Sequence, residues 1–521
     1  MPKQKTDDLI HLIQSLTRAE KRHFRLFVRR NQASEDILFL QLFDFLDKNK
    51  EYDEALILQR LPGIKKRQLS NLKAHLYKQL LTSLRLLNTN HVHDIQIREQ
   101  VDFARILYNK GLYRQSLDIL DKAKQRAREG LYHPLQLEIL DFEKHIEGQY
   151  ITRSIEGRAE ALTAETEALL PLIKHINDFS NLSLQLYGLY LKAGYVRNSR
   201  DYRKVTEFFH KNLPPAQYGD LDFLGRVYYC QSHVWYYYMV QDFAYYYRYA
   251  RKWVNLFQAL PAMKELYAPL YLKGMHNLLM ALFNVLQYDK FMAALKDLNA
   301  IPEMDSFRYG NNIEGLFYMY QYTHTIQRHF MEGTFRQGTA LVPELMELIE
   351  TDRYNWDEHR VMVFYYNIAC LYFGCGDYNE AIHYLNLIIN QKNPDYRADI
   401  QCFARILNLI AHFELGNQQL VEYQVKSVYR FLAKMEDLQL VHREIFRFLR
   451  RTPRMQETEL REEFIHLKDK LMALKDDPYE RRPFLYLDII SWLESKIGQK
   501  PVQDVIRDKF FARQASMDRV W

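Results

Sequence analysis

Apolar residues recur along most of the chain with the 3.6-residue spacing of α-helices, and no segment shows the convincing alternation of a β-strand. The helical segments come in pairs joined by a recurring phrase. Copies of this phrase are GLYRQSLDIL from Gly111, QDFAYYYRYA from Gln241, LQYDKFMAAL from Leu286, GTFRQGTALV from Gly333, GDYNEAIHYL from Gly376 and the decayed GNQQLVEYQV from Gly416. We predict an all-α protein in which each phrase is a tight turn between two helices.

An aromatic residue shortly after each turn marks a period. These residues are Tyr113, Phe243, Tyr288, Phe335 and Tyr378. In the copy from Gly416, Gln418 stands where the aromatic residue would be, and Tyr202 of DYRKVTEFF is assigned the same position in a further unit. From Tyr202 onward the spacings are 41, 45, 47, 43 and 40 residues, a mean near 43, and the 89 residues from Tyr113 to Tyr202 leave room for two units. A helix pair buries its apolar face only by stacking on its neighbours, so this period predicts an α-solenoid.

The segment YYNIACLYFGCGDYNEAIHYLNLIINQKNP resembles a tetratricopeptide repeat. The matching residues are Tyr365, Ile368, Ala369, Tyr372, Ala381 and Leu385, with Pro394 one residue past the closing proline, and a second match contains Ala104, Leu107 and Ala123. The resemblance covers residues 95–435, although the units are longer than the family's 34 residues. It implies a right-handed solenoid of helix pairs. Residues 1–94 would form a helical N-terminal domain, and 436–521 a helical cap or a docking helix for a partner.

In that family, four positions of each unit line a concave groove, and the resemblance places mostly aromatic residues there. The predicted partner-binding residues are Tyr228, Trp235, Tyr238, Met280, Phe283, Tyr320, Phe330, Tyr366 and Phe373. Such rings also fill the contact between units, so packing remains an alternative to binding. Twelve aromatic residues fall within 228–253, and about half of them are expected in the core. The remaining rings could stack on nucleic-acid bases, but the predicted groove positions of four successive units contain only one basic residue, Lys273, which disfavours nucleic acid there.

Two basic surfaces are predicted within the roughly five helices of residues 1–94. Thr17 and Glu20 form a capping box, and the helix that follows has Arg18, Arg22, Arg25 and Arg29 on one face. The segment from Glu54 to Arg67 resembles a LuxR-type helix-turn-helix, which implies that Lys65, Lys66 and Arg67 begin a recognition helix. A purely structural helix pair is the alternative, because the second helix has a regular apolar face. That face consists of Leu69, Leu72, Leu76, Leu80, Leu84 and Leu87.

Composition narrows the function classes. The 521 residues have a net charge of only +6, which demands no polyanionic partner. No metal-binding, phosphate-binding or catalytic motif is readable, and the four cysteines have no paired spacing, so we expect no enzyme, cofactor or metal. Without a secretory signal or a long apolar run, we expect a cytoplasmic protein that does not enter a membrane.

These observations predict a protein–protein interaction scaffold or adaptor that binds a peptide or helix in an aromatic concave groove. The alternative is a nucleic-acid-binding transcriptional regulator, with the basic N-terminal helices on the nucleic acid and the repeats as a sensor or partner platform. The partner and the oligomeric state are not indicated by the sequence.

Overall fold

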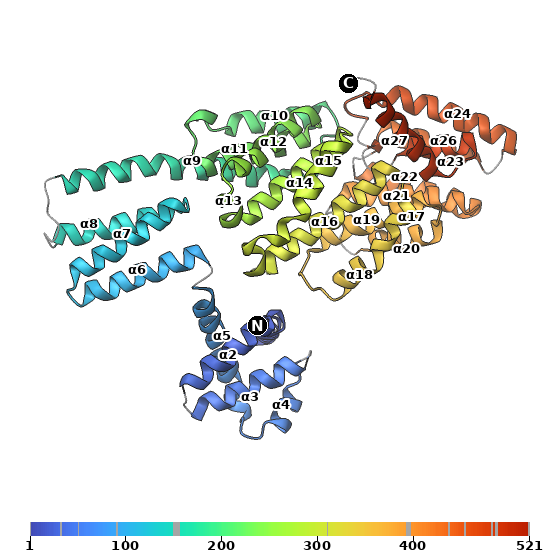
Figure 1. The fold of residues 1–521 in the computed structure, drawn as a ribbon. Helices are drawn as coiled ribbons and strands as arrows, with labels where there is room; N and C mark the ends of the chain where they lie inside the picture. The colour runs from blue at the N-terminus through green and yellow to red at the C-terminus, as the bar shows by residue number, and fades with distance from the viewer. Residues whose placement is uncertain are drawn as a thin grey trace. The chain divides into compact units, whose positions relative to one another are not determined.

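The computed structural model describes residues 2–31, 34–49, 52–89, 92–149, 157–309, 311–391, 397–435, 438–452, 455–480, 483–484 and 488–518. These residues are mainly helical and include no β-strand, which confirms the all-α prediction (Figure 1). The chain forms two compact units, residues 1–173 and 174–521, and the boundary lies inside the 36-residue helix α9 (Arg158–Ala193). Each unit is therefore described by itself.

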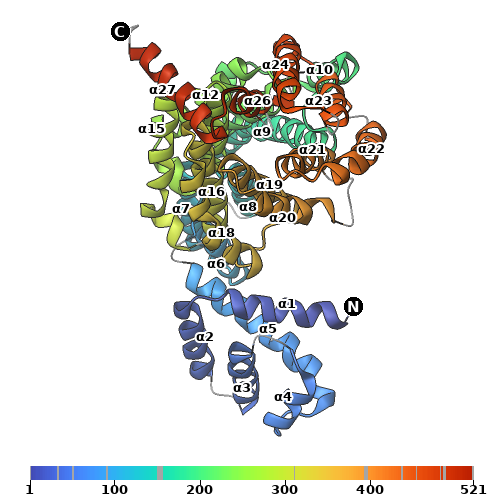
Figure 2. The same cartoon turned by 90° about the vertical axis from the view of Figure 1, so that its right-hand side faces the viewer.

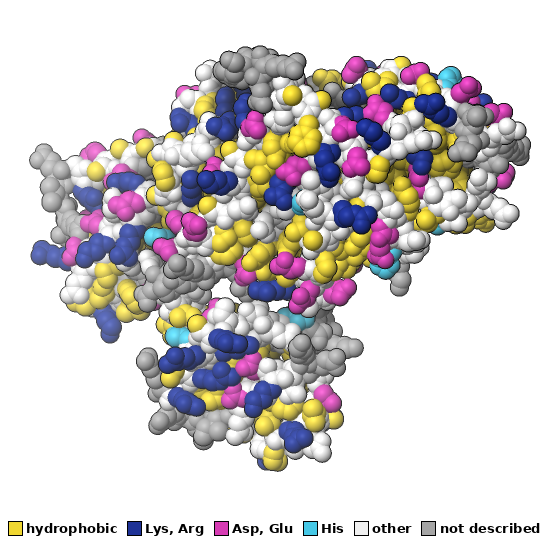
Figure 3. Space-filling model, turned by 45° about the vertical axis from the view of Figure 1, so that its right-hand side comes forward, with side chains coloured by type: hydrophobic (Ala, Val, Ile, Leu, Met, Phe, Trp, Pro, Cys, Tyr) yellow, Lys and Arg dark blue, Asp and Glu magenta, His cyan; other side chains and the backbone are white. Residues whose placement is uncertain are grey.

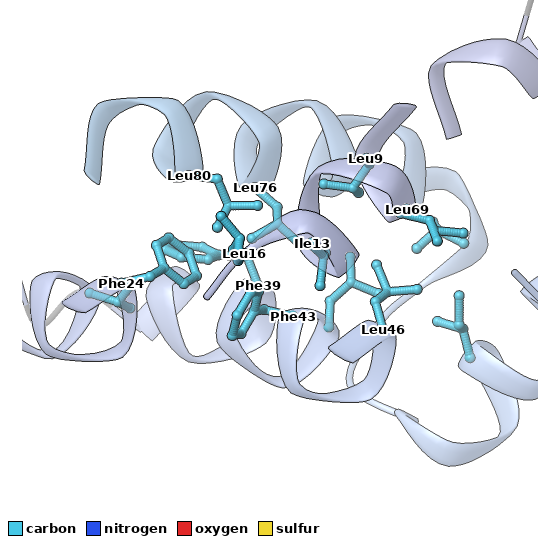
Figure 4. Close-up of a cluster of buried hydrophobic side chains, with 14 of the residues drawn as sticks. Leu9, Ile13, Leu16, Phe24, Phe39, Phe43, Leu46, Leu69, Leu76 and Leu80 are labelled. Carbon is cyan, nitrogen blue, oxygen red and sulfur yellow. The ribbon is translucent and has the colours of Figure 1, made fainter. Parts of the chain in front are cut away.

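The first unit begins with the five helices expected there. They are α1 (Pro2–Ser15), α2 (Arg18–Asn31), α3 (Ser34–Lys48), α4 (Glu54–Arg60) and α5 (Lys66–Asn88). The predicted capping box is present, because the Thr17 N–H donates to Glu20 Oε2 at 2.7 Å and the Glu20 N–H donates to Thr17 Oγ1 at 3.2 Å. Helix α5 packs against α1, α2 and α3, and its buried Leu69, Leu76 and Leu80 meet Phe24 and other core residues (Figure 4). The regular apolar face of α5 is thus used in a core.

Three further helices and the start of α9 complete the first unit. They are α6 (His93–Asn109), α7 (Tyr113–Glu129) and α8 (His133–Gln149), and each packs against the next. A buried ion cluster ties them to α9: Lys124 Nζ lies 2.6 Å from Glu143 Oε2, and Arg158 Nη2 lies 3.2 Å from Glu143 Oε1. This cluster joins α7, α8 and α9 beneath their surface.

The recurring phrase forms one kind of turn wherever it was recognised. At Gly376 the backbone has φ +86°, and the Asp377 N–H donates to the Tyr372 carbonyl at 2.9 Å, which closes the preceding helix with a left-handed residue. Gln241 and Leu286 adopt the same left-handed conformation without glycine, at φ +61° and +55°. The residues marking the period are the first residues of the following helices, namely Tyr113, Phe243, Tyr288, Phe335, Tyr378 and Gln418.

The prediction for Tyr202 is wrong. This residue is the fourth of helix α10 (Ser199–Asn212), after a five-residue link, and it is 40% exposed, so it does not follow a tight turn as the other period residues do. The link ends at Asn198, whose side-chain oxygen accepts from the Asp201 N–H at 2.9 Å and starts α10 without a tight turn. Between Tyr113 and Tyr202, α8 and the single long helix α9 replace the two expected units.

The second unit continues with helices that pack in sequence order. After α10 come α11 (Phe223–Met239), α12 (Phe243–Ala259), α13 (Ala262–Leu266), α14 (Ala268–Asn284), α15 (Tyr288–Asn299), α16 (Asn311–Glu332), α17 (Phe335–Gly338), α18 (Val342–Glu350), α19 (Glu358–Gly374), α20 (Tyr378–Ile389), α21 (Ala398–Glu414) and α22 (Gln418–Lys434). Helix α14 contacts α12, α15 and α16, so successive pairs lie against one another. This packing is consistent with a helical repeat fold.

The last helices fold back onto the others of this unit. They include α23 (Leu440–Arg451), α24 (Glu457–Leu474), α26 (Ile489–Gly498) and α27 (Val502–Asp518). The buried Trp492 of α26 donates from Nε1 to Glu414 Oε1 of α21 at 2.6 Å. Helix α27 packs on α16 (Figure 2). Its Phe510 ring meets Tyr288 of α15 edge to face at 4.8 Å. The amphipathic segment 483–497 therefore has at least part of its apolar face buried inside the protein.

Candidate functional site

The structure places the nine predicted groove residues of the second unit in two groups. Tyr320, Tyr366 and Phe373 are buried, with only 6%, 5% and 3% of their surface exposed. These three are therefore corrected from partner-binding to packing residues, because a partner cannot reach them in this structure. The half-buried group comprises Tyr228, Trp235, Tyr238, Met280, Phe283 and Phe330.

Contacts between the first helices of successive pairs explain this burial. The His276 ring of α14 stacks on Tyr320 of α16 at 4.3 Å, and its Nδ1 lies 3.0 Å from Nε2 of His324. His324 Nδ1 lies 2.8 Å from Gln327 Oε1, and Gln327 Nε2 donates back to Met280 Sδ at 3.0 Å. Burial lowers the pKa of His324 to about 4, so the imidazole is neutral near pH 7. The predicted groove surface of α14 and α16 is thus a side-chain network.

Helix α9 closes over the aromatic residues of α11. Its Tyr190 ring lies 5.4 Å from both Trp235 and Tyr238. The Arg397 guanidinium, at the start of α21, lies 5.5 Å over the Tyr190 ring and binds Asp399 through two hydrogen bonds of 2.8 Å. Residues about 200 positions apart therefore cover the face on which a groove was expected. No repeat phrase marks Tyr190, so the sequence reasoning missed it.

An open cavity lies instead between α6 and α8 of the first unit. It has a volume of about 510 Å³ and is lined by Arg105, Pro134, Leu137, Glu138, Asp141 and Phe142. Arg105 lies 5.6 Å over the Phe142 ring, and its Nη2 is 4.0 Å from Glu138 Oε1. The cavity combines one half-buried aromatic ring with charged side chains of both signs. We call it the α6–α8 groove.

Contacts beneath the α6–α8 groove hold the Phe142 ring in its wall. Tyr108 packs edge to face on Phe142 at 5.6 Å, and its hydroxyl donates to Gln149 Oε1 at 2.7 Å. Burial raises the pKa of Glu143, the residue after Phe142, while hydrogen bonding and charge from Lys124 act in the opposite direction. Arg105 and Tyr108 flank Leu107 of the second repeat match, whereas nothing in the sequence indicates that Phe142 lies opposite them.

The helix-turn-helix prediction falls on α4, a turn and α5. The Asp53 side chain starts α4 by accepting from the Ala55 and Leu56 N–H groups at 2.9 and 3.0 Å. In the turn that follows, the Ile64 side chain is buried. Lys65, Lys66 and Arg67 are exposed at the start of α5, as predicted, and no ion pair joins them to any residue that the structure describes. Ser70, Asn71 and Ala74 continue the exposed surface along α5.

The basic face of α2 is divided. Arg25 connects α2 to α3: its guanidinium lies 5.1 Å over the Phe43 ring, and its Nη2 is within 2.9 Å of carboxylate oxygens of both Asp44 and Asp47. Arg25 thus has a structural role between α2 and α3 that the sequence did not indicate. Arg18, Arg22 and Arg29 are exposed. The visible face of the N-terminal helices carries several Lys and Arg side chains (Figure 3).

In the described parts of the chain, no group of three or more His, Cys, Asp and Glu residues is placed to hold a metal ion. Cys230 and Cys402 are buried, Cys370 and Cys375 are half-buried, and none of the four is in a disulfide. Of the helices described, none combines the length and apolar character needed to span a bilayer.

Comparison with known proteins adds no identity to this geometry. No protein-family model, no curated protein and no solved structure matches the chain.

Proposed function

We propose that the protein is a non-enzymatic interaction module whose α6–α8 groove binds a peptide or helix of a partner protein. The observation that carries this proposal is the cavity of about 510 Å³ with the Phe142 ring in its wall. Aromatic residues near the centre of an interface commonly supply much of its binding energy. Among the lining residues Glu138 and Asp141 outnumber Arg105, and their ion pairs with Arg105 and Lys144 are long, at 4.0 and 3.9 Å. The preferred partner segment therefore has an apolar side chain next to a basic one.

The proposed architecture is a right-handed solenoid of tetratricopeptide-like helix pairs with units of about 43 residues. It comprises an N-terminal domain at 1–94, repeats at 95–435 and a cap at 436–521. The recurring left-handed turn supports this proposal, as does the burial of Ala104, Ala123, Ala369 and Ala381 where the family has small residues. In this arrangement Arg105 belongs to the inner side of the first repeat.

Two labelled 12-residue peptides test the binding proposal, one composed of Leu and Lys and the other of Leu and Glu. We expect the full chain to bind the Leu/Lys peptide more tightly. Phe142→Ala should weaken binding by about 2 kcal/mol, roughly thirtyfold, because it removes the aromatic anchor. Phe103→Ala is the matched control, since Phe103 is exposed on α6 but does not line the cavity.

Equal affinity for the two peptides would contradict the assigned charge preference. Unchanged affinity of Phe142→Ala would contradict the site. The double variant Glu138→Gln/Asp141→Asn separates the two outcomes, because it should reduce the preference for Lys while it leaves the aromatic contact in place.

We propose nucleic-acid binding by α5 as the second candidate function. The observation that favours it is the exposed start of α5, where Lys65, Lys66 and Arg67 have no ion pair to a described residue. Side chains at the start of such a helix reach base edges in the major groove, while cations contact phosphates. Small and polar Ser70, Asn71 and Ala74 leave room for close approach to a duplex.

Duplex binding is tested by its salt dependence with a labelled 20-base-pair DNA. The triple variant Lys65→Gln/Lys66→Gln/Arg67→Gln should lower the slope of log K against log salt by about 0.9 for each lost phosphate contact. Equal slopes for the variant and the unaltered chain would contradict the role of α5.

A further inference from the structure

A ladder of tyrosine rings runs over α11, α12 and the short helix η1 (Tyr218–Asp220). Its members are Tyr218, Tyr229, Tyr237, Tyr245 and Tyr249, which we call the tyrosine ladder. The Tyr237 ring stacks on Tyr245 at 4.9 Å and 17° and on Tyr249 at 5.5 Å and 11°. Tyr229 joins the ladder at 6.1 Å from Tyr249 and 5.4 Å from Tyr218. The tyrosine ladder is a preformed row of rings.

The tyrosine ladder is supported from within and accessible from without. The buried His233 ring lies 4.1 Å from Tyr229 and 4.3 Å from Tyr249, and its Nδ1 is 2.8 Å from the Tyr229 carbonyl oxygen. Tyr245 is 43% exposed, and the other ladder rings are half-buried. Tyr237 follows Trp235 by two residues, which places it on the opposite face of α11 from the ring that packs on Tyr190. The ladder is therefore separate from the filled inner face.

Cations are interleaved with these rings. Arg248 lies 5.7 Å from the Tyr245 centroid, and Lys252 lies 5.4 Å from Tyr249 and 5.2 Å from Tyr218. Arg226 lies 5.3 Å over Tyr218, where it also donates to the Tyr218 and Gly219 carbonyls. Cation–π contacts of this kind hold the charges near the rings without neutralising them.

Carboxylates do not balance this charge. Helices α11 and α12 contain Arg226, Arg248, Arg251 and Lys252 and no Asp or Glu. Asp222 and Asp242 cap these helices, where they accept from the Gly225 and Tyr245 N–H groups, and Asp220 is exposed in η1. Among the described residues, Arg248, Arg251 and Lys252 have no ion pair. The surface thus favours a partner with several negative charges.

Planar rings beside cations without ion pairs suit a single nucleic-acid strand better than a duplex or an acidic peptide. A single nucleic-acid strand offers both phosphates and open base faces, and proteins bind it by stacking bases on aromatic rings along a basic surface. A duplex hides its base faces, and an acidic peptide lacks planar groups to stack. Tyr237 lies eight positions after Tyr229, a rise of about 12 Å along α11, which matches roughly three or four stacked bases.

We propose that the tyrosine ladder binds single-stranded nucleic acid. A base extends the stack at the exposed Tyr245 ring, and phosphates lie near Arg248, Arg251 and Lys252. This site is distinct from the α6–α8 groove and from the start of α5.

Fluorescence anisotropy of the full chain with labelled 12-nucleotide oligo-dT and oligo-rU tests the proposal. We expect binding that weakens with salt at a slope of about −0.7 per phosphate contacted, or about −2 for three cations. Tyr245→Ala should lower the affinity about tenfold. Arg248→Gln/Arg251→Gln/Lys252→Gln should remove most of the salt dependence. Because Tyr245 and Arg248 are exposed, thermal melting of each variant should remain that of the unaltered chain.

Two controls locate the site. Tyr423→Ala removes a 78% exposed ring on α22, and Lys65→Gln/Lys66→Gln/Arg67→Gln removes the α5 cations; neither should change oligonucleotide binding. The proposal is overturned if Tyr245→Ala binds normally, or if the α5 variant loses binding. It is also overturned if polyglutamate or a 12-base-pair duplex competes as strongly as unlabelled oligo-dT. If Tyr245→Ala alters the melting temperature, the single variant Arg248→Gln takes its place, and normal oligonucleotide affinity of that variant overturns the proposal.

Discussion

The two units differ in how far the helix faces that carry the repeat residues are covered by other parts of the chain. In the first unit, Arg105 and Phe142 border an open cavity of about 510 Å³ between α6 and α8. In the second, Tyr320 is buried against His276, and Tyr190 packs on Trp235. Arg105 thus borders an open groove in one unit, whereas the predicted groove residue Tyr320 is part of a core in the other. The difference lies in what covers the face, because helix α9 and Arg397 fold over the second one.

Truncation of a buried ring should have the largest effect on this contrast. We expect Tyr320→Ala to lower the free energy of unfolding by about 3–5 kcal/mol, the range for large aromatic side chains in a core. Urea denaturation followed by circular dichroism measures this change. Tyr423→Ala, which truncates an exposed ring, should leave the curve unchanged. A stable Tyr320→Ala protein would mean that the inner face of the second unit is open to solvent.

The buried histidines predict acid sensitivity of the second unit. Burial lowers the pKa of His324 from its ordinary value of 6.5 to about 4. Between these values the unfolded chain binds the proton and the folded chain does not, so stability falls as pH is lowered from 6.5 to 4. His324 alone contributes about 3 kcal/mol to this loss.

Urea denaturation at several pH values measures this dependence. His324→Gln should flatten it, although His276 still contributes because burial also lowers its pKa. His383→Gln serves as the control, because His383 is exposed on α20. A variant with an unaltered pH profile would show that His324 takes up its proton in the folded state.

Two turn glycines separate local strain from the packing of α27. Gly333 and Gly376 both have positive φ, so alanine costs about 1–2 kcal/mol at either position. A Cβ on Gly333 would also lie 2.6 Å from backbone atoms of Arg507 and Gln503, whereas Gly376 faces open space. We expect Gly333→Ala to be the more destabilising and to speed proteolysis within 489–518. Equal behaviour of the two variants would argue against the α27 contact.

The smallest effect on stability is expected in the open groove. Phe142→Ala should cost only about 1 kcal/mol, because its ring is half-buried, while it abolishes most peptide affinity. Thermal melting beside the peptide titration checks both quantities on one sample. A loss of stability as large as that of Tyr320→Ala would place Phe142 in a core and end the contrast between the units.

Local patterns in the sequence were sufficient for the helices and their turns. The turn at Gly376 forms from hydrogen bonds between neighbouring residues, so a short phrase predicts it wherever the phrase recurs. The same holds for the start of α5 and for its buried leucines. The prediction failed at Tyr202, where Asn198 starts the helix after a longer link and the aromatic residue has no turn to follow.

The tertiary structure, in contrast, decided which side chains are exposed and which residues they contact. Spacing along a helix places Trp235 and Tyr320 on an inner face, but not whether another helix covers that face. That depends on contacts between residues distant in sequence, such as Tyr190 with Arg397, or Arg25 with Asp47. Helix periodicity is a property of a few neighbouring residues, whereas burial sums over every segment that packs nearby. For this reason the sequence by itself determined which side chains share a helix face, and only the fold decided which faces remain open.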